Sequence, residues 1–159
     1  MTHYKAVVFD RDGTLNKTAQ TPGGYVLTCD QLELLPSAAD VVALARAKGI
    51  VPYVFTQQSC IGKGLLTEQA LGLIHQRLQE LLGPQARIEK FYYCPHVEAD
   101  GCNCRKPKPG MLLALMMETG LKPHEVLVVG DSARDQAAAS AAGMDYISCA
   151  SGWPENFLK

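Results

Sequence analysis

An apolar run that ends in two closely spaced carboxylates constrains this chain more than any other stretch. Residues 7–16 read Val-Val-Phe-Asp-Arg-Asp-Gly-Thr-Leu-Asn. Residues 5–9 are rich in Val and bounded by charge and glycine, which is typical of a central parallel strand buried on both faces. Asp10 is therefore expected at the carboxyl end of this strand, and Asp12 in the loop beyond it. Ligands bind at this edge of open α/β sheets, and two carboxylates there can hold a divalent cation.

An Asp-x-Asp-Gly run is also typical of a turn or of the start of a calcium-binding loop. A calcium loop continues with a third oxygen ligand two residues on and ends in a glutamate. This chain has Thr14 in place of the third ligand, and the segment 19–22, where the glutamate would be expected, reads Ala-Gln-Thr-Pro. The sequence therefore favours a ligand site at a strand end over a calcium loop.

Length and charge exclude several classes of function. The chain has 159 residues, a net charge of −1 and a pI near 6.4, so it lacks the basic surface by which proteins bind nucleic acid or acidic membranes. Its length predicts one domain over residues 1–159. It has no apolar run long enough to span a membrane and no hydrophobic signal-peptide core at its start. We expect a cytoplasmic monomer.

Apolar strands alternate with helical patterns along the chain. Strands are predicted at 5–9, 50–55, 88–93, 125–129 and 145–148. Helices are predicted after an N-cap at Ser37 and up to Gly49, from Thr67 to Gly83, and over 110–119 and 134–142. This alternation predicts an α/β fold with a doubly wound parallel sheet. The loop at 17–30, which contains Pro22-Gly23-Gly24, leaves the sheet near the two carboxylates and is placed to cover a site there.

Three predicted strands end in polar side chains, at Asp10, Thr56 and Asp131. Together with Asp12 and Lys106 in the loops, they supply the groups that phosphoryl transfer needs. Asp10 is placed to attack phosphorus and form an aspartyl-phosphate. Asp12 is placed to protonate the leaving oxygen and later to deprotonate water. Lys106 supplies a fixed positive charge and Thr56 a hydroxyl donor for the phosphoryl oxygens.

A cation must offset the negative charge of two carboxylates and a phosphate in one pocket. Mg²⁺ prefers oxygen ligands and retains water molecules, so it fits this role. Its expected ligands are Asp10, the backbone carbonyl of Asp12 and the side chain of Asp131. The alternative for Asp131 is a carboxylate that only stabilises the start of the next helix.

A second cluster of metal-ligand residues lies between the third strand and the 110–119 helix. Three of the six cysteines crowd into eleven residues beside a histidine, in the pattern Cys94-x-His96-x5-Cys102-x-Cys104. Three thiolates and one imidazole complete a tetrahedral shell, which is typical of a structural Zn²⁺ site. Such a site would stiffen the loop and so place Arg105 and Lys106, which follow its last ligand.

These residues resemble the four motifs of the haloacid dehalogenase superfamily of phosphatases. The matching positions are Asp10-x-Asp12-Gly13-Thr14, Thr56, Lys106 and Gly130-Asp131-x3-Asp135. Within the superfamily, the segments 10–16, 24–26, 91–96 and 104–111 resemble the heptose 1,7-bisphosphate 7-phosphatases. The resemblance runs from about residue 4 to residue 143.

The resemblance implies a Rossmann-like fold without a cap domain. It implies removal of the 7-phosphate from D-glycero-D-manno-heptose 1,7-bisphosphate, a small phosphorylated sugar used on the route to lipopolysaccharide or surface-layer glycans. It carries over the magnesium ligands to Asp10, Asp12 and Asp131, and gives Arg105 the role of binding the far phosphate. Further substrate contacts are expected from Arg11, Gly24, Tyr25, Gln57, Gln58 and Ser59.

Some positions depart from the pattern of this subfamily. Gln57 stands where Asn is usual, Cys60 where Gly is usual, and Ser132 where a substrate-facing Lys is common. Histidinol-phosphate phosphatase, which shares the zinc loop, is therefore retained as an alternative together with other small phosphate esters. A binding protein that holds a phosphorylated sugar without turnover is a second alternative, although it would not need both Asp10 and Asp12.

Overall fold

One parallel five-stranded sheet organises the computed structural model, which describes residues 3–158. Its strands are β1 (Ala6–Asp10), β2 (Val51–Gln57), β3 (Phe91–Cys94), β4 (Val126–Gly130) and β5 (Asp145–Ser148), in the order β3-β2-β1-β4-β5. The helices are α1 (Ala38–Ala47), α2 (Glu68–Leu82), α3 (Gly110–Thr119) and α4 (Ala133–Ala141). The predicted doubly wound α/β fold is confirmed.

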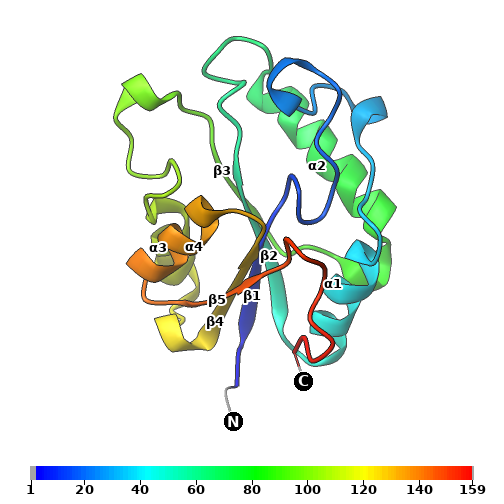
Figure 1. The fold of residues 1–159 in the computed structure, drawn as a ribbon, viewed down its shortest axis with the longest axis vertical. Helices are drawn as coiled ribbons and strands as arrows, with labels where there is room; N and C mark the ends of the chain where they lie inside the picture. The colour runs from blue at the N-terminus through cyan, green and yellow to red at the C-terminus, as the bar shows by residue number, and fades with distance from the viewer. Residues whose placement is uncertain (1–2, 159) are drawn as a thin grey trace.

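Helices cover both faces of the sheet, with α1 and α2 on one side and α3 and α4 on the other (Figure 1). All five residues of β1 are buried, and they alternate between two apolar cores. Val7 and Phe9 pack in the core beneath α1 and α2, whereas Ala6 and Val8 pack in the core beneath α3 and α4. Burial on both faces explains why β1 is a continuous apolar run.

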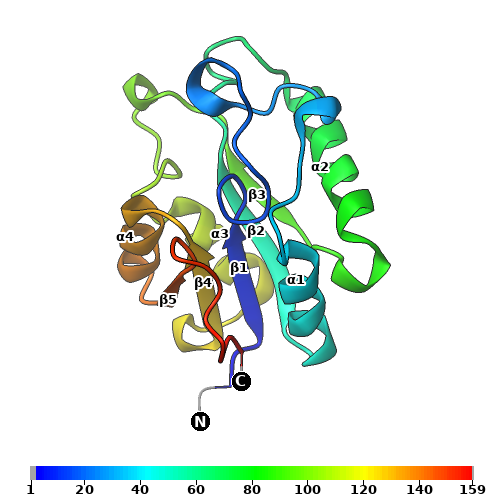
Figure 2. The same cartoon turned by 45° about the vertical axis from the view of Figure 1, so that its right-hand side comes forward.

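The strand register brings three of the predicted site residues to one edge of the sheet. Asp10 at the end of β1 pairs with Phe55 of β2, so Thr56 lies one residue further along the neighbouring strand. On the other side Phe9 pairs with Val129 of β4, and Asp131 follows two residues later. The segment after β1 rises above this edge (Figure 2).

Two local predictions were wrong. Ser37 does not cap α1, because its backbone is left-handed (φ 68°) and its side chain makes no capping hydrogen bond. The third strand begins at Phe91 and not at residue 88, because the side chain of Gln79 on α2 binds both the N–H and the C=O of Ile88 at 2.8 and 2.7 Å. By contrast, the cap of α2 is as predicted, since Thr67 accepts the N–H of Ala70 at 3.1 Å.

Two large apolar side chains are exposed on α3, where Met117 is 88% exposed and Leu113 46% exposed. The monomeric state therefore remains a prediction. Over residues 3–158, no helix is long and apolar enough to cross a membrane.

After β5 the chain returns to the core, where the rings of Trp153 and Phe157 lie 6.0 and 6.4 Å from that of Phe9.

Candidate active site

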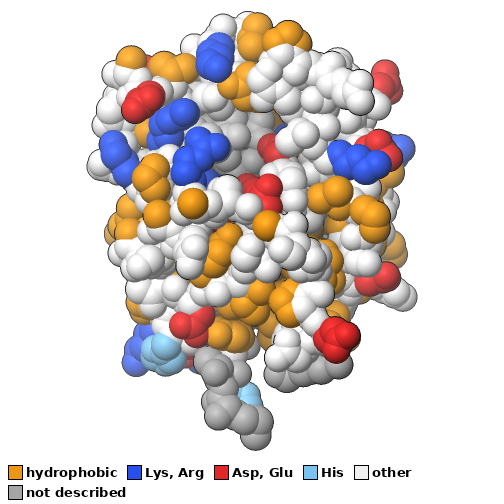
Figure 3. All heavy atoms as spheres, viewed as in Figure 1, with side chains coloured by type: hydrophobic (Ala, Val, Ile, Leu, Met, Phe, Trp, Pro, Cys, Tyr) orange, Lys and Arg blue, Asp and Glu red, His pale blue; other side chains and the backbone are white. Residues whose placement is uncertain are grey.

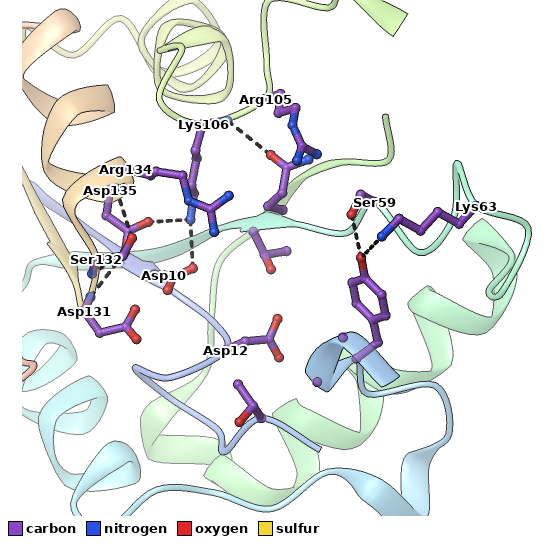
Figure 4. A pocket seen from close by; sticks show the side chains of 16 residues that line it. Asp10, Asp12, Ser59, Lys63, Arg105, Lys106, Asp131, Ser132, Arg134 and Asp135 are labelled. Carbon is purple, nitrogen blue, oxygen red and sulfur yellow. Dashed lines mark hydrogen bonds and ion pairs between the residues drawn. The ribbon is translucent and has the colours of Figure 1, made fainter. Parts of the chain in front are cut away.

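A buried lysine joins two carboxylates at the carboxyl edge of the sheet (Figure 4). Lys106 Nζ lies 2.8 Å from Asp10 Oδ1, 2.8 Å from Asp135 Oδ1 and 3.1 Å from the carbonyl oxygen of Phe55. Lys106 is 5% exposed and Asp135 1% exposed. The ammonium group is thus held at the end of β1 by one residue from each of three different segments.

Burial and charge act in opposite directions on this group of residues. Burial raises the pKa of Asp10 well above its usual value, and the adjacent ammonium of Lys106 opposes this rise. Burial by itself would lower the pKa of Lys106, but the attraction of Asp10 and Asp135 outweighs it and leaves the pKa raised. Lys106 therefore carries a fixed positive charge beside Asp10.

The carboxylates of Asp10, Asp131 and Asp135 lie close enough to share a metal ion, since one oxygen of each falls within 4.8 Å of the others. Gly13 lies directly against this cluster with φ 87°, and a side chain there would collide with the Asp131 carboxylate. Clustered carboxylate oxygens suit a hard cation such as Mg²⁺. The side chain of Asp12 is not part of the cluster, which fits the prediction that it contributes its backbone carbonyl.

Asp135 was present in the motif but received no role in the sequence-based prediction. Its Oδ2 accepts the N–H groups of Asp131 and Ser132, both at 3.2 Å, while Ser132 Oγ accepts the N–H of Asp135 at 3.3 Å. This reciprocal capping box begins α4. The Ser-x-x-Asp spacing was the signal that could have identified it.

Asp12 is held by three side chains. Its Oδ1 accepts from Arg11 Nη2 at 2.8 Å and from Asn16 Nδ2 at 3.0 Å, and its Oδ2 accepts from Gln58 Nε2 at 2.8 Å. The same amide nitrogen of Gln58 donates to Thr56 Oγ1 at 2.8 Å. Because Thr56 accepts this bond, its own hydroxyl proton remains available to a phosphoryl oxygen.

Two residues predicted to bind substrate do not reach the pocket. Arg11 is fully buried and Gln58 is 1% exposed, and neither lines the cavity. Arg11 follows Asp10 in the motif, but side chains alternate along the chain, so the Arg11 side chain points beneath the site towards His75 on α2. Both residues instead hold Asp12.

A pocket of about 370 Å³ opens in front of these groups. Of the residues predicted to bind substrate, it is lined by Gly24, Tyr25, Gln57, Ser59 and Arg105. It is also lined by Lys63 and Arg134, which sequence reasoning missed because isolated surface cations carry no motif. Lys and Arg side chains gather at the upper left of the face in Figure 3, with acidic side chains near its centre.

One tyrosine joins two loops at the side of the pocket. Tyr25 Oη lies 2.9 Å from Ser59 Oγ and accepts a hydrogen bond from Lys63 Nζ at 2.8 Å (Figure 4). The bonds from Lys63 and then Ser59 lower the pKa of Tyr25. This cluster ties the loop at 17–30 to the segment that follows β2, so the first loop does cover the site as predicted.

The predicted cysteine and histidine ligands converge in the loop after β3. Cys94 Sγ lies 3.7 Å from Cys102 Sγ and 3.5 Å from His96 Nδ1, and His96 Nδ1 lies 3.2 Å from Cys104 Sγ. Thiolates bound at about 2.3 Å to a tetrahedral ion lie about 3.8 Å apart. The pair Cys94 and Cys102 has this spacing, whereas Cys94 Sγ and Cys104 Sγ lie closer, at 3.0 Å.

Two thiols in this loop have shifted pKa values. Burial raises the pKa of Cys102, but the backbone N–H groups of Cys104 and Arg105 outweigh this effect and lower it to about 6. Burial and the neighbouring Cys94 and Cys102 raise the pKa of Cys104 to about 12. A bound cation would offset this repulsion between thiolates.

Gln57 connects β2 to this loop. Its Nε2 donates to the carbonyl of His96 at 3.3 Å, and its Oε1 accepts the N–H of Lys106 at 3.1 Å. Arg105 Nη1 also donates to the His96 carbonyl, at 3.2 Å. The longer amide at position 57 therefore helps to place Lys106. Cys60 is buried and its φ is not positive, so the glycine it replaces is not required there.

Comparisons with known proteins agree with this geometry. A family model for haloacid dehalogenase-like hydrolases matches residues 16–143. The chain belongs to this family of hydrolases. The prediction that this chain is an enzyme of the haloacid dehalogenase type is thereby confirmed.

Curated relatives and a solved structure are similar over most of the chain. The D-glycero-beta-D-manno-heptose-1,7-bisphosphate 7-phosphatase of Neisseria meningitidis is 36% identical over 87% of this chain and 73% of its own length. The D-glycero-alpha-D-manno-heptose-1,7-bisphosphate 7-phosphatase of Mycobacterium bovis is 37% identical over 94% of this chain and 78% of its own. The crystal structure of D,D-heptose 1,7-bisphosphate phosphatase from B. bronchiseptica, complexed with magnesium and phosphate, is 31% identical with a TM-score of 0.83, and the match covers 89% of this chain and 78% of that one.

Proposed function

We propose that this enzyme removes the 7-phosphate from D-glycero-D-manno-heptose 1,7-bisphosphate. The observation that carries the proposal is that three cationic side chains line the pocket besides Lys106. Lys106 is already paired with Asp10 and Asp135, yet Lys63, Arg105 and Arg134 also line the cavity. One transferred phosphoryl group does not need three further cations, whereas a substrate with a second phosphate does. Relatives at 36–37% identity bear this activity in their names.

In the proposed reaction, a carboxylate oxygen of Asp10 attacks the phosphorus of the 7-phosphate. The bond from phosphorus to the sugar oxygen breaks, and Asp12 gives its proton to that oxygen. Water then attacks the phosphorus of the aspartyl-phosphate, and Asp12 takes a proton from this water. The bond from phosphorus to the Asp10 oxygen breaks, which releases inorganic phosphate and the Asp10 carboxylate. Lys106 and the hydroxyl of Thr56 hold the equatorial oxygens throughout.

Asp10, Asp131 and the backbone carbonyl of Asp12 would hold Mg²⁺, with Asp135 beside them. The ion would neutralise charge on the phosphoryl oxygens. Zn²⁺ is proposed for Cys94, His96, Cys102 and Cys104, because three thiolates and an imidazole match its preferred ligands. Its role is structural, since the four protein ligands fill a tetrahedral shell. A cytoplasmic location and a monomeric state remain predictions.

Arg105 and Arg134 are proposed to bind the 1-phosphate, on the side of the pocket where Lys106 lies. Lys63 and Tyr25 are proposed to close the opposite side of the pocket. The anomer is the open part of this assignment, because relatives named for the beta and for the alpha substrate are about equally similar. Histidinol phosphate carries a single phosphate and would leave the two arginines without an anion.

The deciding experiment measures phosphate release, with Mg²⁺, from both anomers of heptose 1,7-bisphosphate, from heptose 7-phosphate and from histidinol phosphate, with Asp10→Asn as the blank. We expect one heptose bisphosphate to exceed the two monophosphates by about 100-fold in kcat/KM, which corresponds to about 2.7 kcal/mol. Arg105→Met together with Arg134→Met should remove most of the preference for the bisphosphate over heptose 7-phosphate. Equal rates on all four esters would refute the substrate assignment, and rates equal to the blank would favour a binding protein.

A further inference from the structure

Arg11 is the largest fully buried side chain in residues 3–158, although it follows the nucleophile directly. A buried guanidinium is stable only where its donors find partners. Nη2 and Nε of Arg11 lie 2.8 and 3.3 Å from Asp12 Oδ1. The other end of the group, Nη1, lies 3.1 Å from Nε2 of His75. Arg11 therefore connects Asp12 to a histidine on α2.

The chemistry of this contact fixes the proton on the histidine. Arginine only donates hydrogen bonds, so His75 Nε2 must accept and the ring must carry its proton on Nδ1. Burial, followed by the charge of Arg11, lowers the pKa of His75 to about 3, which keeps the ring neutral. The ring also stacks on Phe91, with centroids 4.1 Å apart and planes 12° apart. It is thus a rigid acceptor anchored in the core.

The two oxygens of Asp12 are unequal as a result. Oδ1 accepts from both Arg11 and Asn16, so a proton placed there would face donors already pointing at it. Oδ2 accepts one hydrogen bond, from Gln58. Asp12 also lines the pocket. The proton that Asp12 gives to the leaving oxygen is therefore expected on Oδ2.

We propose that His75 is a positioning residue for catalysis: by accepting the Nη1–H of Arg11, it fixes the guanidinium that binds Asp12 Oδ1 and so aims Oδ2 at the reacting atoms. Oδ2–H gives its proton to the leaving oxygen, and Oδ2 later takes one from water. This proposal rests on the proposed phosphatase activity. His75 itself touches no substrate.

The test compares His75→Leu, which removes the acceptor, with His75→Gln, which keeps one in the amide oxygen. Two kinds of substrate separate positioning from general damage. An alkyl phosphate, here the heptose bisphosphate, needs a proton on its leaving oxygen, whereas p-nitrophenyl phosphate releases a stable anion without one. For His75→Leu we expect kcat/KM to fall by about 10- to 100-fold on the alkyl ester and by less than about threefold on the aryl ester. His75→Gln should restore the alkyl rate to within about threefold of wild type.

Equal losses on both substrates, or a His75→Gln variant as slow as His75→Leu, would overturn the proposal and leave His75 a packing residue. An alkyl rate unchanged in a folded His75→Leu variant would also overturn it. If His75→Leu does not fold, a His75→Gln variant that falls more than about threefold below wild type on the alkyl ester overturns the proposal. A direct reading comes from ¹⁵N NMR of the His75 ring in the wild type, where the proton is expected on Nδ1 at neutral pH. A proton on Nε2 would refute the contact itself, whereas a wild type inactive on every ester would refute the proposed function instead.

Discussion

At the scale of single residues, the site depends on carboxylates that differ in their binding partners and in their proposed roles. Asp10 and Asp12 are proposed to take part in the chemistry, whereas Asp135 binds Lys106 through one oxygen and two backbone N–H groups through the other. Removing one partner of a buried ion pair leaves the other charge without compensation.

Replacing Asp135 with Asn is therefore expected to harm both activity and stability. Lys106 loses one of its two carboxylates, and the cap of α4 loses a charged acceptor. We expect kcat/KM to fall about 100-fold and the free energy of unfolding to fall by about 3 kcal/mol, measured by urea titration. The matched control is Asp145→Asn, which removes the charge of the carboxylate that accepts from the Tyr4 hydroxyl at 2.6 Å, away from the pocket. An Asp135→Asn enzyme as active as this control would contradict the assigned role.

The buried His75 predicts how stability depends on pH. Its folded pKa of about 3 lies below its unfolded value of 6.5, so below pH 6.5 the unfolded chain binds a proton that the folded chain does not. Its contribution is therefore complete above pH 6.5 and is lost as the pH falls towards 3. Between pH 6 and 4, the wild type should lose about 1.4 kcal/mol per pH unit more than His75→Gln. Parallel stability profiles of the two proteins would refute this expectation.

Which residues meet in the fold could be predicted where a motif fixes both the residue type and the spacing. This holds for Asp10, Asp12, Lys106 and the four cysteine and histidine residues, which the fold brings to two places. The burial of Arg11 was not predicted, because it depends on the direction in which the side chain leaves the loop. Lys63 and Arg134 were missed because only the folded loops bring them to the pocket.

At the scale of elements, two loops complete a site that the strands only begin. The loop after β3 delivers Lys106, and Gln57 and Arg105 both bind the carbonyl of His96 within it. The loop at 17–30 is joined to the segment after β2 through Tyr25. Neither loop contains a long helix or strand, so each depends on a few specific contacts.

Loss of one ligand from the cysteine and histidine cluster should therefore displace Lys106. We expect Cys104→Ser to purify with less than about one tenth of the zinc of wild type and to lose about 10- to 100-fold in kcat, read by elemental analysis and phosphate release. Cys29→Ser is the matched control, because Cys29 lies outside the cluster. Full activity in a zinc-free Cys104→Ser protein would contradict the assigned role of the loop.

The bridge at Tyr25 predicts an effect on substrate binding. Tyr25→Phe removes the hydroxyl that joins Ser59 and Lys63, at a cost of about 1 kcal/mol in loop closure. KM should rise about fivefold while kcat stays within about twofold. Tyr4→Phe loses a hydrogen bond remote from the pocket and should leave KM unchanged. A fall in kcat without a change in KM would show that Tyr25 acts on the chemistry instead.

Element types could be predicted from periodicity, but their ends depended on side chains elsewhere. The ranges of α3 and β5 were predicted correctly, because Gly120 and a change of pattern mark them. The start of β3 was not, because Gln79 of α2 takes the backbone groups of Ile88. Ser37 was not a cap because the chain enters α1 through a left-handed turn.

At the scale of the whole molecule, the last residues complete the core that supports β1. Phe157 is 4% exposed and packs with Trp153 against Phe9, the residue before Asp10. The parallel sheet could be predicted from the alternation of elements. The return of the segment after β5 to the core could not be predicted, because two isolated aromatic residues form no periodic pattern in the sequence.

Phe157→Ala should lower the free energy of unfolding by about 3 kcal/mol, which corresponds to a fall in Tm of about 6–12 °C for a chain of this size. Met117→Ala removes a similarly large but 88% exposed side chain and should change Tm by less than about 2 °C. Thermal unfolding monitored by circular dichroism measures both. Equal Tm values for the two variants would show that the tail does not support the core.

The central position of β1 also has a consequence for biosynthesis. β1 leaves the ribosome first, and β2 supplies the partner on one side, but its other edge waits for β4, which begins at residue 126. At about 5–20 residues per second, several seconds separate the two pairings. During this interval the nascent chain presents the unpaired edge of an apolar strand, which is a template for association with other chains. We therefore expect the edge of β1 to be most open to association with other chains during the period of translation between β2 and β4.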